Sequence, residues 1–259
     1  MTVMKAVKLW AELFLVAGSL AASAEHLDGL AAPLVSQGFA TQDNEGFAAL
    51  SLTDGNSRTL RLNLGAAALW GNPELWEHRV GGEYNLGQTA TKGGSKRDLE
   101  QGRLMTNSRR RWTGPYYAAV DAALSYDPIA DIDYRITLGP ALGADVAASP
   151  TVRASVETGP GALWERVGGT DHRFVTLRVA QQFDWKMDPR SKLWQRLEWT
   201  GELVNPANFL VLFEIGVEAR ITERTRLRTS LQDRYDSTPA SEARRNDLAL
   251  ATGIAWSFR

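Results

Sequence analysis

The chain has 259 residues, enough for one large domain or two small ones. Its formal net charge of -1 lacks the basic excess expected of a nucleic-acid-binding protein. It contains no cysteine, which excludes disulfide bonds and thiolate metal sites. Hydrophobic residues make up 44% of the chain, too large a share for an intrinsically disordered protein.

Segment 1–24 has the layout of a secretory signal peptide. Lys5 and Lys8 precede a mostly apolar stretch over residues 9–20, and Ala22-Ser23-Ala24 offers the small residues that signal peptidase requires. We therefore expect export through the periplasm and a mature chain that begins at Glu25. Segment 25–43 has no regular hydrophobic period, and we interpret it as a short periplasmic leader.

After the signal segment no run of about 18 apolar residues occurs, which excludes membrane-spanning helices. Apolar and polar residues instead alternate, which is the pattern of a β-strand. The clearest case is Tyr116 to Tyr126, where one face is apolar with a tyrosine at each end and the other face carries Asp121 and Ser125. At about 3.3 Å per residue and a tilt of about 45°, this segment rises roughly 25 Å, which matches the apolar band of an outer-membrane barrel.

Alternating segments recur along the whole region 44–259. We predict an all-β fold, a single transmembrane up-and-down antiparallel β-barrel of about twelve strands. The expected strands cover 44–53, 57–70, 74–87, 99–112, 115–127, 133–147, 151–166, 172–185, 191–204, 208–222, 225–236 and 246–258. An even number of strands places both ends on the periplasmic side, where turns are short. The connections at 71–73, 113–114, 149–150, 188–190 and 223–224 fit such turns, whereas 88–98, 128–132 and 237–245 are longer and are expected on the outer side; the outer turn at 54–56 is a short exception.

The last segment carries alternating apolar residues at Leu250, Ile254, Trp256 and Phe258. Such an amphipathic terminal strand resembles the signal recognised by the outer-membrane barrel assembly machinery. We therefore expect that machinery and the lipid bilayer of the bacterial outer membrane as partners. The alternative is an ordinary edge strand of a soluble sheet, which would leave an apolar, unpaired edge that promotes aggregation.

Several short motifs follow one another between residues 44 and 258. They are Asp54-Gly55-Asn56-Ser57, Asp133-Tyr134-Arg135 leading to Gly139 and Gly143, Glu157-Thr158-Gly159-Pro160-Gly161, Arg234-Tyr235-Asp236-Ser237-Thr238-Pro239, and Asn246-Asp247 before Phe258. In order and spacing they resemble the salt-induced outer-membrane protein family (YdiY-like), a domain of unknown function. The resemblance implies an outer-membrane β-barrel and a link to salt or osmotic stress, but no substrate and no catalytic residues.

Charged residues fall on the strand face opposite to the apolar one, which becomes the lumen of a barrel. The lumen-lining candidates are Arg61, Glu77, Arg79, Glu83, Asp121, Arg135, Glu157, Arg178, Arg196, Glu198, Glu214, Glu218, Arg220 and Arg228. Both signs occur in near balance, so no sharp ion selectivity is expected. Either the charges line a narrow, water-filled channel, or they pair across the lumen and close it. A barrel of about twelve strands is smaller than a wide-pore porin, which favours a narrow or largely closed lumen.

Aromatic residues near the ends of segments are expected at the two membrane interfaces. These residues are Trp70, Trp76, Tyr116, Tyr126, Trp164, Trp256 and Phe258.

The three histidines do not indicate an enzyme. His26 lies in the leader, His78 falls on the lipid-facing side of its strand, and His172 lies at a loop edge. None has a nucleophile partner by sequence pattern and no metal-ligand spacing repeats, so we expect no catalytic residues, no metal and no cofactor. Three functions remain, in order of preference. They are a narrow channel or permeability element for small solutes, linked to salt stress through the family; a non-conducting structural or partner-binding barrel; and a lipid-modifying enzyme.

Overall fold

The computed structural model describes residues 44–53, 58–72, 75–91, 94–129, 131–238 and 245–258. The expected signal peptide, the leader and the first outer turn at 54–56 lie outside these residues. No helix among the described residues has the length and apolar character needed to cross a membrane.

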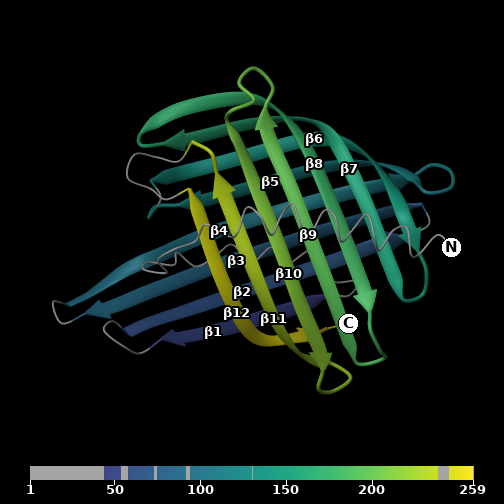
Figure 1. The fold of residues 1–259 in the computed structure, drawn as a ribbon, viewed down its shortest axis with the longest axis horizontal. Helices are drawn as coiled ribbons and strands as arrows, with labels where there is room; N and C mark the ends of the chain where they lie inside the picture. The colour runs from purple at the N-terminus through teal and green to yellow at the C-terminus, as the bar shows by residue number, and fades with distance from the viewer. Residues whose placement is uncertain are drawn as a thin grey trace. The chain divides into compact units, whose positions relative to one another are not determined.

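The described chain forms twelve strands. They are β1 (Glu45–Thr53), β2 (Arg58–Asn72), β3 (Trp76–Thr91), β4 (Gly94–Arg111), β5 (Tyr116–Asp127), β6 (Ile132–Ala148), β7 (Val152–Val167), β8 (Thr170–Lys186), β9 (Ser191–Glu202), β10 (Phe209–Arg220), β11 (Thr225–Asp236) and β12 (Asn246–Ser257). Each strand pairs antiparallel with its neighbours in sequence, and β1 also pairs with β12, which closes the barrel. Figure 1 shows these two strands side by side although they come from opposite ends of the barrel sequence. The predicted up-and-down antiparallel barrel is confirmed.

Alternation along each strand becomes an inner and an outer face. On β5, Tyr116, Val120 and Leu124 are exposed, Val120 at 49%, whereas Tyr117 and Ala119 are buried. The other strands repeat this arrangement, so large apolar side chains cover the outside of the barrel. Examples are Leu60 and Leu64 on β2, Leu104 on β4, Leu138 and Leu142 on β6, Val175 and Val179 on β8, and Leu250 on β12.

We call the end of the barrel that carries the start of β1 and the end of β12 the termini end. The connections at this end are short, as expected: 73–75, 112–115, 149–151, 187–190 and 221–224. In the turn after β8, the carboxylate of Asp188 accepts a hydrogen bond of 2.7 Å from the backbone N–H of Arg190. This hydrogen bond favours the charged form and lowers the pKa of Asp188 below its ordinary value.

The prediction of a long loop over 88–98 on the opposite side of the barrel is wrong. β3 continues to Thr91 and β4 begins at Gly94, with a register shift between Gly87 and Gln88. Beyond the apolar band of a barrel a strand pair needs no apolar face, because the backbone hydrogen bonds of the ladder hold it. The polar sequence of this ribbon therefore carried no alternation from which strands could be predicted.

The β6–β7 pair has a break in its ladder at mid-strand. Pairing is interrupted over 139–141 of β6 and 159–161 of β7, and the register on either side sets Pro140 opposite Pro160. A proline nitrogen carries no hydrogen, so two ladder hydrogen bonds cannot form here. A Cβ at Gly159 would overlap the carbonyl oxygen of Pro140. Only glycine at this position therefore lets the backbones of β6 and β7 lie in direct contact where the ladder is interrupted.

Candidate functional site in the barrel interior

The inner face of β1, β10 and β11 carries a cluster of two acids and two arginines near the termini end. We call Glu45, Glu218, Arg226 and Arg228 the termini-end cluster. Arg228 contacts Glu45 at 2.9 Å and Glu218 at 2.6 Å, and Arg226 contacts the same two carboxylates at 2.6 and 3.0 Å. Each carboxylate therefore binds both guanidinium groups, which satisfies the charges as a set of four.

The Arg228 guanidinium is fully enclosed by the barrel interior. Its side chain and that of Glu45 are 0% and 1% exposed. The guanidinium carbon lies 5.6 Å from the Phe47 ring and 5.4 Å from the Trp194 ring, so aromatic faces cover the charge that the carboxylates do not reach. The Trp194 Nε1–H in turn donates to Glu214 at 3.2 Å. Water has no access to this arginine, so its charge depends on its protein partners.

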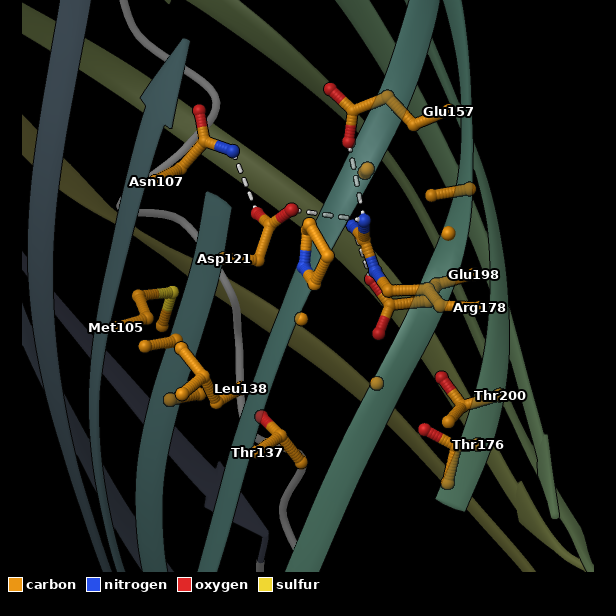
Figure 2. Close-up of a pocket in the computed structure, with 18 of the residues that line it drawn as sticks. Met105, Asn107, Asp121, Thr137, Leu138, Glu157, Thr176, Arg178, Glu198 and Thr200 are labelled. Atoms are coloured by element: carbon orange, nitrogen blue, oxygen red, sulfur yellow. Dashed lines mark hydrogen bonds and ion pairs between the residues drawn. The ribbon is translucent and has the colours of Figure 1, made fainter. Parts of the chain in front are cut away.

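A second set of charges, the central network, joins strands that are not neighbours. It consists of Arg109 on β4, Asp121 on β5, Glu157 on β7, Arg178 on β8 and Glu198 on β9. Arg178 contacts Glu198 at 2.8 Å, Glu157 at 3.2 Å and Asp121 at 3.3 Å, and Arg109 contacts Glu157 at 2.6 Å. Figure 2 shows Arg178 between Asp121 and Glu157, with contacts to both. The Arg178–Asp121 and Arg109–Glu157 pairs pass over the inner face of β6.

Small residues on the inner face of β6 make room for these long side chains. Ala141 is buried there, and a Cβ at Gly143 would overlap the ring of Tyr117. The Tyr117 hydroxyl donates to Glu157 at 3.0 Å, and the Asn107 side-chain amide donates to Asp121 at 2.6 Å. Neutral donors thus complete the coordination of both carboxylates.

A cavity of about 160 Å³ adjoins the central network. Arg79, Arg103 and Arg196 line it together with the network residues, and the mid-strand segments of β6 and β7 form part of its wall. A cavity of this size has room for about ten waters or one small solute. The interior of the barrel therefore holds a cavity whose wall carries charged side chains.

The other candidates lie at several levels of the barrel. Arg79 pairs with Glu77 at 2.8 Å, and Arg135 pairs with Glu165 at 2.6 Å. Glu83 and Glu214 are buried, Arg61 and Arg196 are half-buried, and Arg220 is exposed at the last position of β10. The structure thus brings Asp121, Glu157, Arg178 and Glu198 together in one network, and Glu218 with Arg228 in another.

Sequence reasoning missed Glu45, Trp194 and Arg109 as interior residues. Arg109 stands in a run of three arginines that obscured the alternation of β4, yet Arg109 contacts Glu157 inside while Arg110 is exposed outside. Counting by two from the apolar Leu104 would have placed Arg110 outside and Arg109 inside. Trp194 has the same parity as the lumen candidates Arg196 and Glu198, so the same counting would have placed it inside.

The seven expected interfacial aromatics divide between the two ends of the barrel. Trp70, Trp76, Tyr116, Trp256 and Phe258 are exposed near the termini end, and Tyr126 and Trp164 are half-buried near the other end. A further ring group at that other end joins Phe209 to Trp199 at 6.4 Å and to Tyr235 at 5.6 Å between ring centroids.

The histidines show one contact that the sequence did not indicate. His78 Nδ1 lies 2.9 Å from the Ser108 hydroxyl on the neighbouring strand. A Ser-His hydrolase also needs a third group that orients the imidazole. Within the described ranges no carboxylate or amide is hydrogen-bonded to His78, whose ring is stacked with Trp70 and Trp76. His172 is exposed and stacks on Phe174 at 6.0 Å, and His26 lies outside the described residues. No group of three His, Asp or Glu side chains that could hold a metal ion occurs in the part of the chain that the structure describes.

A closed antiparallel barrel with an apolar exterior and charges inside defines the class of transmembrane β-barrels. Within this class the chain belongs to the family described as protein of unknown function, DUF481, whose model matches residues 47–258. The YdiY-like label of the resemblance is consistent with this family. No curated protein sequence matches the chain.

Three solved structures are similar to this chain. An outer-membrane channel from Pseudomonas putida F1 is similar over 91% of this chain and 100% of its own, with 12% identity and a TM-score of 0.52. The NanC porin is similar over 83% of this chain and 99% of its own, with 10% identity and a TM-score of 0.49. The translocator domain of the autotransporter NalP from Neisseria meningitidis covers 83% of this chain and 87% of its own, with 10% identity and a TM-score of 0.48.

Proposed function

We propose that this protein lies in the bacterial outer membrane, inserted by the barrel assembly machinery through β12, with the termini end in the periplasm. The distribution of polarity supports this placement. Val120 and Leu142 are 49% and 58% exposed on the outside, whereas Arg228 and Glu214 are 0% exposed inside. A soluble protein has the reverse arrangement, because exposed apolar area and buried charge both raise its free energy in water.

Within the membrane, the geometry supports a narrow, largely closed channel that acts as a permeability element for small solutes. One observation carries this proposal: Arg178 pairs with Asp121, and Arg109 with Glu157, each across two intervening strands of the barrel. Side chains that meet over this span occupy the lumen between them. The adjoining cavity of about 160 Å³ has room for water or a small solute.

The proposal is tested by swelling of liposomes that contain the purified protein. We expect slow swelling in small solutes and none in larger sugars. Arg178→Ala removes three ion pairs of the central network and should speed entry of small solutes. Arg166→Ala is the matched control, because Arg166 forms exposed pairs near the outer end of the barrel. Rapid entry of large sugars through the wild-type protein would contradict a narrow lumen.

A non-conducting structural or partner-binding barrel is the second candidate, favoured by the enclosure of Arg228 between carboxylates and rings. It predicts no solute entry through either the wild-type protein or Arg178→Ala. We propose no enzymatic role, because His78 lacks an orienting partner among the described residues. The link to salt or osmotic stress rests on the family resemblance alone, and it predicts a changed protein level in cells grown with added sodium chloride.

A further inference from the structure

Arg110 points outward from the barrel wall. Arg110 is exposed on β4 near the termini end, and its guanidinium carbon lies 5.4 Å from the centroid of the Trp76 ring on β3. Among the side chains that the structure describes, no carboxylate forms an ion pair with Arg110, in contrast to Arg109 and Arg111 on either side of it. A charge on a membrane-facing strand is costly unless an opposite charge compensates it. The described side chains therefore leave the charge of Arg110 open to a counter-ion from a ligand.

Flat aromatic groups lie in a row beside this arginine. His78 is stacked with Trp70 and with Trp76, at 5.9 and 5.7 Å between ring centroids. Ser108, two residues before Arg110, holds the His78 ring by the contact to Nδ1. Both tryptophans are exposed, and tryptophan prefers the level of the lipid headgroups to the hydrocarbon core. We call Trp70, Trp76, His78, Ser108 and Arg110 the outer patch.

We propose that the outer patch binds the headgroup of an anionic glycerophospholipid of the periplasmic leaflet. The Arg110 guanidinium presents a planar fork of donors that matches the oxygens of a phosphate. The ring of Trp76 packs against this guanidinium and limits its rotamers, so less entropy is lost when a phosphate binds. The exposed faces of Trp70 and Trp76 offer apolar area to the upper part of the acyl chains.

A lipid phosphate fits this patch better than a free phosphate ion. One exposed arginine binds a small anion weakly, because water and salt screen the pair. The bilayer, however, holds lipid phosphates at the depth of the aromatic belt, which gives them a high effective concentration at Arg110. The inference rests on the proposed placement of the termini end in the periplasm, but not on whether the lumen conducts.

Native mass spectrometry of the purified protein tests the inference. The protein is released from mixed micelles that contain equal amounts of phosphatidylglycerol and phosphatidylcholine, and retained lipid is counted. We expect the wild-type protein to retain phosphatidylglycerol with a preference of about fivefold, the size of one arginine–lipid attraction at a membrane surface. Arg110→Gln should reduce this preference to near one. Arg224→Gln, which removes an exposed arginine from the turn between β10 and β11 at the same end, should leave it unchanged.

Other outcomes would overturn the inference. Equal retention of the two lipids by the wild-type protein, or an unchanged preference in Arg110→Gln, would show that the outer patch does not recognise an anionic headgroup. Loss of the preference on addition of inorganic phosphate would point to a simple anion site. Gel mobility before and after heating, and flotation with vesicles, report barrel folding and membrane insertion separately. A protein that fails these two assays contradicts the membrane placement, whereas an inserted protein without lipid preference contradicts the outer patch alone.

Discussion

The termini-end cluster allows a direct measurement of how dry the barrel interior is. Glu218→Ala changes the cluster from two acids and two arginines to one acid and two arginines, with Arg228 still fully enclosed. Breaking a buried ion pair by removing one partner costs about 3–5 kcal/mol, because the remaining charge lacks compensation. The same removal in a hydrated, exposed pair costs about 0–1 kcal/mol. We expect Glu218→Ala to lower the free energy of unfolding by about 3–5 kcal/mol.

Urea unfolding of the protein in lipid vesicles, followed by tryptophan fluorescence, gives these free energies. Asp171→Ala is the matched control, since the carboxylate of Asp171 pairs with Arg166 at 3.5 Å and both side chains are about half exposed. The double variant Glu218→Ala/Arg226→Ala restores neutrality and should recover part of the lost stability. If Glu218→Ala costs no more than Asp171→Ala, water screens the cluster and the lumen is open at this level.

Three further predictions concern the wall and the processing of the barrel. Val120→Arg places a charge on the outer face at mid-strand and should cost about 2–4 kcal/mol and reduce assembly, whereas Asp121→Asn next to it should assemble normally; equal loss of the heat-modifiable gel band in both variants would mean that the two faces are exchanged. The double variant Pro140→Ala/Pro160→Ala restores two backbone N–H donors between β6 and β7. It should raise the free energy of unfolding by about 1 kcal/mol per hydrogen bond in the same urea assay, and a decrease would indicate that the backbone here gains nothing from these donors. N-terminal sequencing of outer-membrane material should find Glu25 first, and retention of the initiator methionine would rule out the expected cleavage.

The barrel could be predicted because its physical signal is local. Each strand repeats an apolar residue every second position, and Tyr116 to Tyr126 alone gives the length and facing of a membrane-spanning strand. Alternation disappears where a strand extends beyond the lipid, because no apolar face is required there. The part of β3 and β4 beyond Gly87 has polar residues on both faces, so the sequence predicted a loop there instead of two strands.

The partners of the interior charges could not be predicted in the same way. Alternation places Arg178 and Glu218 on the inner face but does not give their positions along the barrel axis. The register of all twelve strands decides which charges meet. Glu218 could have met an arginine of the opposite wall by its parity, yet its register pairs it with Arg228 on the adjacent strand. Small residues on β6 then decide that Arg178 reaches Asp121, and such steric room is a property of the folded wall.

Single-channel recording in planar lipid bilayers tests the central claim, a barrel whose lumen is narrowed by buried ion pairs, most directly. We expect little steady conductance through the wild-type protein at moderate salt. We expect discrete, larger current steps through Arg178→Ala, because that change removes the pairs to Asp121, Glu157 and Glu198 at once. Steady, porin-sized conductance through the wild-type protein, unchanged in Arg178→Ala, would contradict it.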